Sequence, residues 1–211
     1  MGRKQNTKIQ ARLPYKLYYF VCEDEKSMPY YLKGLKQKYD GKIVIKSKTS
    51  RGKNVLSIQK QAKKLQTEIK NTSAYANGYK IIACFDKDNN KIEDISEVIS
   101  KNKKSDVMAT VYNNPCYEYW LLLHTKSTAQ EFINSEQCCK EAMKAINNTY
   151  GTKFKDLDKF KSTENIFDIV GNDLPKAIQN AKSLKLDDYN STYTNAHIIF
   201  EEIIKNTQNN N

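Results

Sequence analysis

Short apolar runs alternate with longer amphipathic segments over the first 126 residues of the chain. The runs are rich in β-branched and aromatic residues, which favours strands over 15–22, 42–48, 79–85 and 107–112. The third run, YKIIACF, is almost continuously apolar, as expected of a strand buried on both faces of a parallel sheet. Because a helical segment follows each strand, the pattern predicts a parallel sheet with helices on both faces.

Residues that favour helix starts precede the amphipathic segments. Ser27, with Pro29 close behind it, and Asn54 are suitable N-caps for the first two helices. A third helix is expected through 92–99, and a fourth, which contains the run Trp-Leu-Leu-Leu, is expected to begin at Pro115.

Strand patterns end at about residue 126. Ser127 and Gln130 have the spacing of a capping box, so we expect a helix from there to Tyr150. Shorter helices are expected around 164–170, 173–186 and 194–205. The sequence therefore predicts an α/β protein with a C-terminal helical layer. Its expected parts are a basic arm (1–14), an α/β core (15–126), a helical region packed on the core (127–206) and a disordered tail (207–211).

Positive charge is concentrated in the first third of the chain. The formal net charge is +11, and residues 1–64 hold 17 Lys and Arg against four acidic residues. The remaining residues hold 18 basic and 20 acidic residues, so the whole excess lies before residue 65. This favours an anionic partner such as nucleic acid, although a lysine-rich solvated surface is the alternative. The candidate nucleic-acid contacts lie after the first strand and along the second strand and its turn: Lys26, Lys46, Lys48, Arg51 and Lys53.

The sequence lacks the apolar segments of membrane and secreted proteins and the cysteine spacing of zinc fingers. No apolar run approaches the roughly 18 residues of a membrane span, and the basic N-terminus has no apolar signal segment. The five Cys show no CxxC spacing. We therefore expect a cytoplasmic protein with reduced thiols and no membrane partner. Cys22, Cys84 and Cys116 each precede an acidic residue, but we interpret them as small apolar side chains in preference to metal ligands.

Acidic residues follow three of the predicted strands. Glu23 and Glu25 follow the first strand, Asp86 and Asp88 follow the third, and Glu118 lies shortly after the fourth. Ligands of parallel sheets bind at the carboxyl ends of the strands, where carboxylates repel one another unless a cation lies between them. The oxygen ligands favour Mg²⁺ or Mn²⁺, which could assist phosphodiester cleavage. The alternative is that these acids only form turns and cap helices.

The segment from Asp86 to Glu97 also places oxygen ligands at several positions of an EF-hand loop. Lys91 occupies the position that requires Gly, and a strand precedes the segment where an EF-hand has a helix. We therefore expect Glu97 on an exposed helix face and no calcium site.

The same segments resemble the RloB family of bacterial proteins. The resemblance lies in VCEDEKSMPYY (21–31), ACFDKDN (83–89) and NPCYEYWLLLH (114–124), in the family's order and spacing, and extends to STYTNAH (191–197). Two positions depart from the family pattern. Asp24 stands where the family has Gly, and Asn89 replaces the last Asp of its FDRDD-like segment.

This resemblance implies a Toprim-like fold, a small parallel sheet flanked by helices. It also implies that Glu23 is the general acid/base, that Asp86 and Asp88 bind Mg²⁺ or Mn²⁺ with Glu23 beside them, and that Glu118 is a further catalytic residue. RloB-like proteins are associated with restriction and abortive-infection loci, often beside an ATPase of the AAA/ABC type. The resemblance therefore implies a nuclease effector in antiphage defence under the control of such a partner.

Three functions remain open from the sequence. The first is the metal-dependent nuclease, the second a non-catalytic nucleic-acid-binding adaptor for a defence ATPase, and the third a phosphatase or nucleotidyl-transfer enzyme with small substrates. Further candidates for the site are Glu25, Asn114 and His124, of which His124 also suits a structural role at the end of its helix. The sequence does not distinguish DNA from RNA as substrate and leaves homo-oligomerisation open.

Overall fold

The structure is a computed structural model that describes residues 16–71, 78–88, 90–184 and 189–208. The predicted basic arm and the last three residues of the predicted tail lie outside these ranges.

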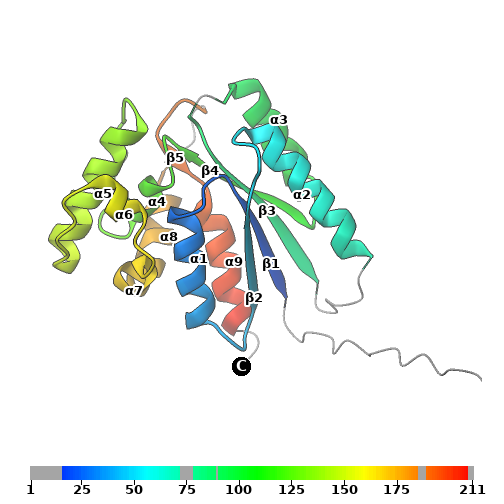
Figure 1. Ribbon diagram of the computed structural model, residues 1–211, viewed down its shortest axis with the longest axis horizontal. Helices are drawn as coiled ribbons and strands as arrows, with labels where there is room; N and C mark the ends of the chain where they lie inside the picture. The colour runs from blue at the N-terminus through cyan, green and yellow to red at the C-terminus, as the bar shows by residue number, and fades with distance from the viewer. Residues whose placement is uncertain (1–15, 72–77, 89, 185–188, 209–211) are drawn as a thin grey trace, which may run out of the picture.

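A five-stranded sheet forms the centre of the molecule (Figure 1). Its strands are β1 (Leu17–Cys22), β2 (Val44–Thr49), β3 (Tyr79–Asp86), β4 (Met108–Asn114) and β5 (Tyr193–Thr194), in the order β2-β1-β3-β4-β5. The first four strands are parallel, and β5 pairs antiparallel with β4. The α/β fold class predicted from the sequence is confirmed.

The order of the strands creates a switch point between β1 and β3. The chain moves outward from β1 to β2, then returns to the other side of β1 to form β3. The connections that leave β1 and β3 therefore diverge to opposite faces of the sheet, and open parallel sheets bind ligands in the crevice that such a divergence leaves. Acidic residues follow both of these strands.

Alternate residues of the strands enter two different cores. Tyr18, Phe20 and Cys22 pack toward the face covered by the C-terminal helices, whereas Leu17 and Val21 pack toward the opposite face. Side chains of a strand alternate between faces, so a strand buried on both sides has to be apolar at successive positions. This explains the continuous apolar runs in the sequence.

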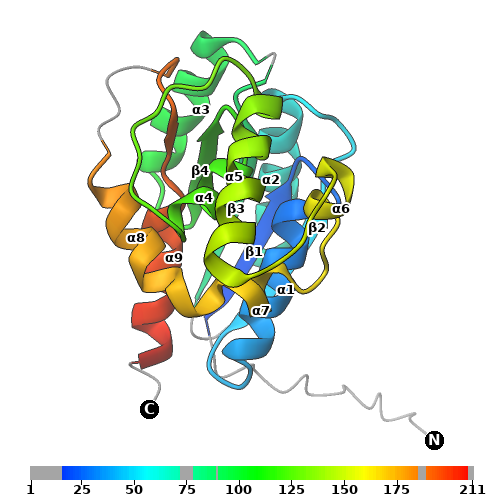
Figure 2. The ribbon, with the colours of Figure 1, turned by 90° about the vertical axis from the view of Figure 1, so that its left-hand side faces the viewer.

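Helices α2 (Val55–Lys70) and α3 (Ile92–Lys103) cover one face of the sheet. Helices α1 (Ser27–Lys38) and α9 (Ala196–Gln208) cover the other face (Figure 2). Outside α1 and α9 lies a further group of short and long helices: α4 (Glu118–Leu123), α5 (Ser135–Tyr150), α6 (Leu157–Lys161), α7 (Ile166–Val170), the 3₁₀ turn η1 (Gly171–Asp173) and α8 (Leu174–Lys182). Within the described ranges, no helix is long and apolar enough to cross a membrane.

The predicted elements of the first 126 residues are confirmed with small shifts at their ends. Asn54 caps α2 as expected, since its side chain accepts a hydrogen bond of 2.9 Å from the Ser57 N–H. The start of α1 differs, because the Asp24 carboxylate accepts the Ser27 N–H at 2.7 Å and thereby takes the capping role assigned to Ser27. Helix α4 begins at Glu118 and not at Pro115.

The long helix predicted from Ser127 is wrong at its start. The helix begins at Ser135, where the Asn134 side chain accepts a hydrogen bond of 2.9 Å from the Gln137 N–H. Glu131, which lies inside the predicted helix, instead accepts hydrogen bonds from the backbone and hydroxyl of Thr192. This contact between distant segments holds residues 127–134 in an irregular conformation.

Three further features of the C-terminal region differ from the predictions. Two elements were not predicted from the sequence: helix α6, whose N-terminus is capped by Asp156, and strand β5. In addition, α9 continues through Gln208, past the point where the tail was expected to begin.

The segment from Asp86 to Glu97 is not an EF-hand loop. It runs from the end of β3 into α3, and Glu97 lies exposed on that helix in an ion pair with Lys101. We therefore expect Glu97→Gln to leave calcium and magnesium affinity unchanged in isothermal titration calorimetry. A large loss of metal affinity from this one substitution would contradict the assignment of this segment.

Candidate functional site

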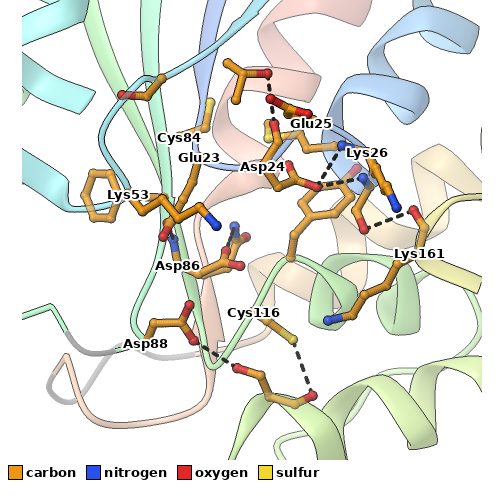
Figure 3. Close-up of a pocket in the computed structure, with 18 of the residues that line it drawn as sticks. Glu23, Asp24, Glu25, Lys26, Lys53, Cys84, Asp86, Asp88, Cys116 and Lys161 are labelled. Carbon is orange, nitrogen blue, oxygen red and sulfur yellow. Dashed lines mark hydrogen bonds between the residues drawn. The ribbon is translucent and has the colours of Figure 1, made fainter. Parts of the chain in front are cut away.

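A pocket of about 820 Å³ lies at the carboxyl ends of the parallel strands. Its walls come from the residues that follow β1, β2, β3 and β4, together with the start of α5 and the end of α6. Acidic and basic side chains both enter it (Figure 3). The pocket lies at the switch point between β1 and β3, as the topology predicts.

Glu23 and Asp86 are joined across the ends of neighbouring strands. The Asp86 N–H donates a hydrogen bond of 3.0 Å to Oε2 of Glu23. Burial raises the pKa of Glu23, this hydrogen bond opposes the shift, and the negative charges of Asp88 and Asp24 add to it. A carboxyl group whose pKa is raised can exchange a proton nearer neutral pH, which suits a general acid/base.

Asp86 lies deeper, at the end of β3. Burial raises its pKa well above the ordinary value, and the negative charges of Glu118, Glu23 and Asp88 contribute to the same shift. The Asn113 amide opposes the shift by donating a hydrogen bond of 3.0 Å to Oδ1. Thr194 of β5 in turn donates to the Asn113 side-chain oxygen at 2.8 Å. The carboxylate of Asp86 is therefore oriented by two strands that follow it in the chain.

Asp88 occupies the exposed rim of the pocket in a left-handed backbone conformation, with φ of 31°. Its carboxylate accepts a hydrogen bond of 3.3 Å from the Ser135 hydroxyl at the start of α5. The Asp-x-Asp pair of the sequence therefore consists of one inner and one outer carboxylate.

Glu118 approaches the pocket from the opposite wall. Its side chain is buried and accepts a hydrogen bond of 2.7 Å from the Ser27 hydroxyl in α1. Lys161, at the end of α6, lies near it. Burial lowers the pKa of this lysine, but the negative charge of Glu118 and the nearby thiols outweigh burial, so the net pKa is raised. Lys161 stays protonated beside the carboxylate.

The basic candidates divide into two groups. Lys26, Arg51 and Lys53 line the pocket, whereas Lys46 and Lys48 are exposed along the edge strand β2 and are not part of its wall. Figure 3 shows Lys53 and Lys161 entering the pocket from opposite sides. The pocket thus combines carboxylates at its base with cations at its sides.

Glu25, a further candidate, also lines the pocket, but Asn114 and His124 lie outside its wall. The Asn114 amide donates hydrogen bonds to the backbone oxygens of Asn190 and Ser191, at 2.6 and 2.8 Å. His124 is fully buried at the C-terminal end of α4. In the structure these two residues therefore hold segments together, whereas Asn113, the neighbour of Asn114, faces the acids.

Asn113 and Lys161 are polar side chains beside the acids that were not predicted from the sequence. Strand alternation places Asn113 on the pocket side of β4 and Asn114 on the other, but the sequence does not show which of the two faces the acids. Lys161 arrives on a short helix that was not predicted. Asp156, whose carboxylate accepts the Lys159 N–H at 2.7 Å, is the one local signal for that helix.

The carboxylates differ from a compact metal cage. Among the described residues, the group whose ligand atoms all lie within 4.8 Å of one another is Cys116, Glu118 and Cys139, and not the trio of Glu23, Asp86 and Asp88. Glu23 and Asp86 nevertheless have hard oxygen donors and raised pKa values, which a nearby cation would lower. The chemistry of these donors therefore suits Mg²⁺ or Mn²⁺, and the acidic metal site remains a prediction.

Comparison with protein families matches residues 18–203 to the RloB-like protein family. Neither the curated proteins nor the solved structures give a match. The matched region covers the whole sheet except the first residue of β1, and it covers every residue of the pocket wall. The chain therefore belongs to the RloB-like protein family.

Proposed function

We propose that this protein is a Mg²⁺- or Mn²⁺-dependent nuclease that hydrolyses phosphodiester bonds in the pocket at the carboxyl edge of its sheet. The observation that carries the proposal is the hydrogen bond from the Asp86 N–H to Glu23, which brings two carboxyl groups with raised pKa values together in a pocket that basic side chains also line. An adaptor that only bound nucleic acid would gain nothing from carboxylates at the base of its binding site, because they repel phosphate.

Each residue has a task in this proposal, and Glu23 has two. Asp86 and Asp88, with Glu23, would hold the divalent ion, which when bound supplies Lewis acidity to the phosphoryl oxygens. Glu23, when protonated, would give its proton to the leaving oxygen as water adds to phosphorus and the P–O bond breaks, and would then take up the proton that the attacking water releases. Lys53 and Lys161 contact phosphate oxygens from the two sides of the pocket.

The proposed partner and biological role rest on the resemblance to the family. RloB-like proteins are associated with restriction and abortive-infection loci beside ATPases of the AAA/ABC type. We propose the same setting for this chain, as an effector in antiphage defence whose activity such an ATPase controls. The competing proposal is a nucleic-acid-binding adaptor, which the basic pocket wall and edge strand also support.

A cleavage assay distinguishes the two. Labelled DNA and RNA are incubated with the protein in Mn²⁺, in Mg²⁺ or in EDTA. We expect cleavage products in Mn²⁺ or Mg²⁺ and uncleaved substrate in EDTA. Glu97→Gln is the matched carboxylate control and should cleave like the wild type. Salt-sensitive binding without cleavage, also in the presence of the partner ATPase, would support the adaptor and exclude the nuclease.

The path of the nucleic acid gives a further prediction. Replacement of Lys46, Lys48, Arg51 and Lys53 by Gln should weaken binding and flatten its dependence on salt, by about 0.7–0.9 log units per lost phosphate contact. The control is a variant with four exposed lysines of the C-terminal helical region replaced in the same way: Lys144, Lys153, Lys155 and Lys176. Fluorescence anisotropy at several salt concentrations measures both slopes. If the salt dependence of binding has the same slope in the two variants, β2 and its turn do not contact the nucleic acid.

A further inference from the structure

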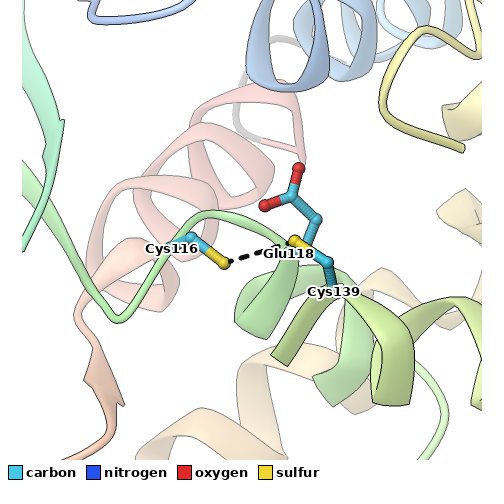
Figure 4. Close-up of side chains that lie close together, drawn as sticks. All are labelled: Cys116, Glu118 and Cys139. Carbon is cyan, nitrogen blue, oxygen red and sulfur yellow. Dashed lines mark hydrogen bonds between the residues drawn. The ribbon is translucent and has the colours of Figure 1, made fainter. Parts of the chain in front are cut away.

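Two cysteines and a glutamate meet at the side of the pocket formed by α4 and α5 (Figure 4). All three side chains are buried, and one ligand atom from each lies within 4.8 Å of those of the other two. The sulfur atoms of Cys116 and Cys139 are 3.7 Å apart. Two sulfurs bound to one tetrahedral zinc ion at about 2.3 Å are separated by about 3.8 Å. The thiols therefore already have the spacing that a shared zinc ion requires.

We propose that Cys116, Glu118 and Cys139 form a zinc site, separate from the acidic edge at Glu23 and Asp86. Sulfur ligands bind zinc strongly and magnesium weakly, so the two sites would select different ions. The proposal changes the interpretation of Cys116, which the sequence suggested was only a small apolar residue.

The charges in this region balance when zinc is bound. Two thiolates and one carboxylate carry three negative charges, and zinc together with the Lys161 ammonium carries three positive charges. Burial lowers the pKa of Lys161, but the lysine lies close enough to Glu118 for the negative charge of this carboxylate to oppose burial and raise that pKa. Without the ion, two protonated thiols leave only the pair of Glu118 and Lys161, which is also neutral. Zinc can therefore replace two thiol protons without leaving an unpaired buried charge.

Neighbouring groups orient the glutamate and leave one position open. The Ser27 hydroxyl donates to Oε1 of Glu118 at 2.7 Å, the kind of hydrogen bond that fixes a ligating carboxylate. Cys116 and Glu118 both contribute to the pocket wall. Three protein ligands leave the fourth tetrahedral position for a small oxygen ligand from the pocket, such as water or phosphate.

A disulfide between the same cysteines is the competing interpretation. A hydrogen bond to Cys138 and burial raise the pKa of Cys116, although the hydrogen bond to Cys139 opposes the shift. A hydrogen bond to Cys116 and burial raise the pKa of Cys139. Oxidants react with thiolates, so the pair is a poor target for them. A metal ion supplies the positive charge that stabilises the thiolates, which an oxidant does not.

Cobalt titration of the full chain tests the site, because Co²⁺ adopts the same coordination and its bonds to thiolate absorb in the near ultraviolet. The reduced, metal-free protein is titrated with Co²⁺ under a phosphine reductant. We expect one equivalent to produce the thiolate-to-cobalt charge-transfer band, one equivalent of Zn²⁺ to abolish it, and excess Mg²⁺ to leave it unchanged. Cys116→Ser and Cys139→Ser should each lose most of the band. Cys22→Ala is the matched control and should keep it, since this buried cysteine on β1 does not belong to the group.

The wild-type titration decides the proposal even if a variant fails to fold. Absence of the charge-transfer band from the folded wild-type protein would overturn the zinc site. A band that survives in folded Cys116→Ser, as judged by circular dichroism, would overturn it as well. The measurement contains no nucleic acid, so its result is independent of whether the pocket cleaves phosphodiesters.

Discussion

Asp86→Asn should abolish cleavage while the metal-free protein keeps or gains stability. Asn has the same shape and retains the oxygen that accepts the Asn113 hydrogen bond. It lacks the charge that repels Glu23, Glu118 and Asp88. We expect cleavage to fall by about two orders of magnitude or more, as for the loss of a general acid/base or metal-binding group, and the same result for Glu23→Gln and Asp88→Asn. Nucleic-acid binding should be mostly retained.

The difference in stability between Asp86→Asn and the wild type should also depend on pH. The raised pKa of Asp86 determines the direction of this dependence. As pH rises, the carboxyl group ionises first in the unfolded chain, so the unfolded state then binds fewer protons than the folded state. Stability of the metal-free wild type therefore falls as pH rises through this interval. Asp86→Asn should show its largest gain in melting temperature at high pH and little gain in acid.

Thermal melts in EDTA and in Mn²⁺, beside the cleavage assay, measure these effects. Stabilisation by Mn²⁺ should shrink in Asp86→Asn, because an ion that binds only the folded state stabilises it in proportion to its affinity. Glu97→Gln is the control. If metal-free Asp86→Asn is destabilised by roughly 0.5–2 kcal/mol, as expected from loss of a turn or capping interaction, and still cuts and responds to Mn²⁺, the acidic centre is wrong.

His124 should make the protein less stable in mild acid. The imidazole shares hydrogen bonds of 3.0 Å with the Tyr31 hydroxyl and the Trp120 carbonyl oxygen. Burial lowers its pKa from 6.5 to about 4. Between these values the unfolded chain binds a proton that the folded chain does not. The stability contributed by the neutral imidazole is therefore complete above pH 6.5 and falls by about 3 kcal/mol as the pH approaches 4.

His124→Asn should remove that part of the pH dependence. Urea unfolding of both proteins at neutral pH and in mild acid gives the difference, in which the opposite contributions of Glu23 and Asp86 cancel. At neutral pH the variant should be about 1–3 kcal/mol less stable, because the Tyr31 hydroxyl loses its partner. It should still cleave, since His124 lies outside the pocket wall. A folded His124→Asn that no longer cleaves would restore a catalytic role for this residue.

The first half of the fold could be predicted because β1, β3 and β4 are buried on both faces and the edge strand β2 still has the β-branched pattern of a strand. The successive apolar residues of β3 are typical of a strand buried on both faces of a parallel sheet. Because β1 and β3 are parallel neighbours, the acids at their carboxyl ends meet at one edge of the sheet. The second half depends on contacts between distant segments. Ser127 begins a locally acceptable capping box, but Glu131 binds Thr192 instead. The two residues of β5 are a strand only because β4 pairs with them.

The residues of the site also divide into those placed by the local sequence and those placed by contacts between distant segments. Glu23 and Asp86 follow their strands directly, so sequence order was enough to place them together. Asn113 and Lys161 reach the pocket through strand register and through the packing of a five-residue helix, neither of which has a strong local pattern.

The hydrogen bonds from Thr194 to Asn113 and from Asn113 to Asp86 set an order of assembly during synthesis. Glu23, Asp86 and Asp88 leave the ribosome long before β5 does. A nascent chain can therefore form the parallel strands and hold all three acids without the Thr194 hydrogen bond that fixes the side chain of Asn113 against Asp86. If the proposed chemistry needs that orientation, activity begins only after β5 has paired with β4. The active site is then complete only late in folding, after β5 has been synthesised.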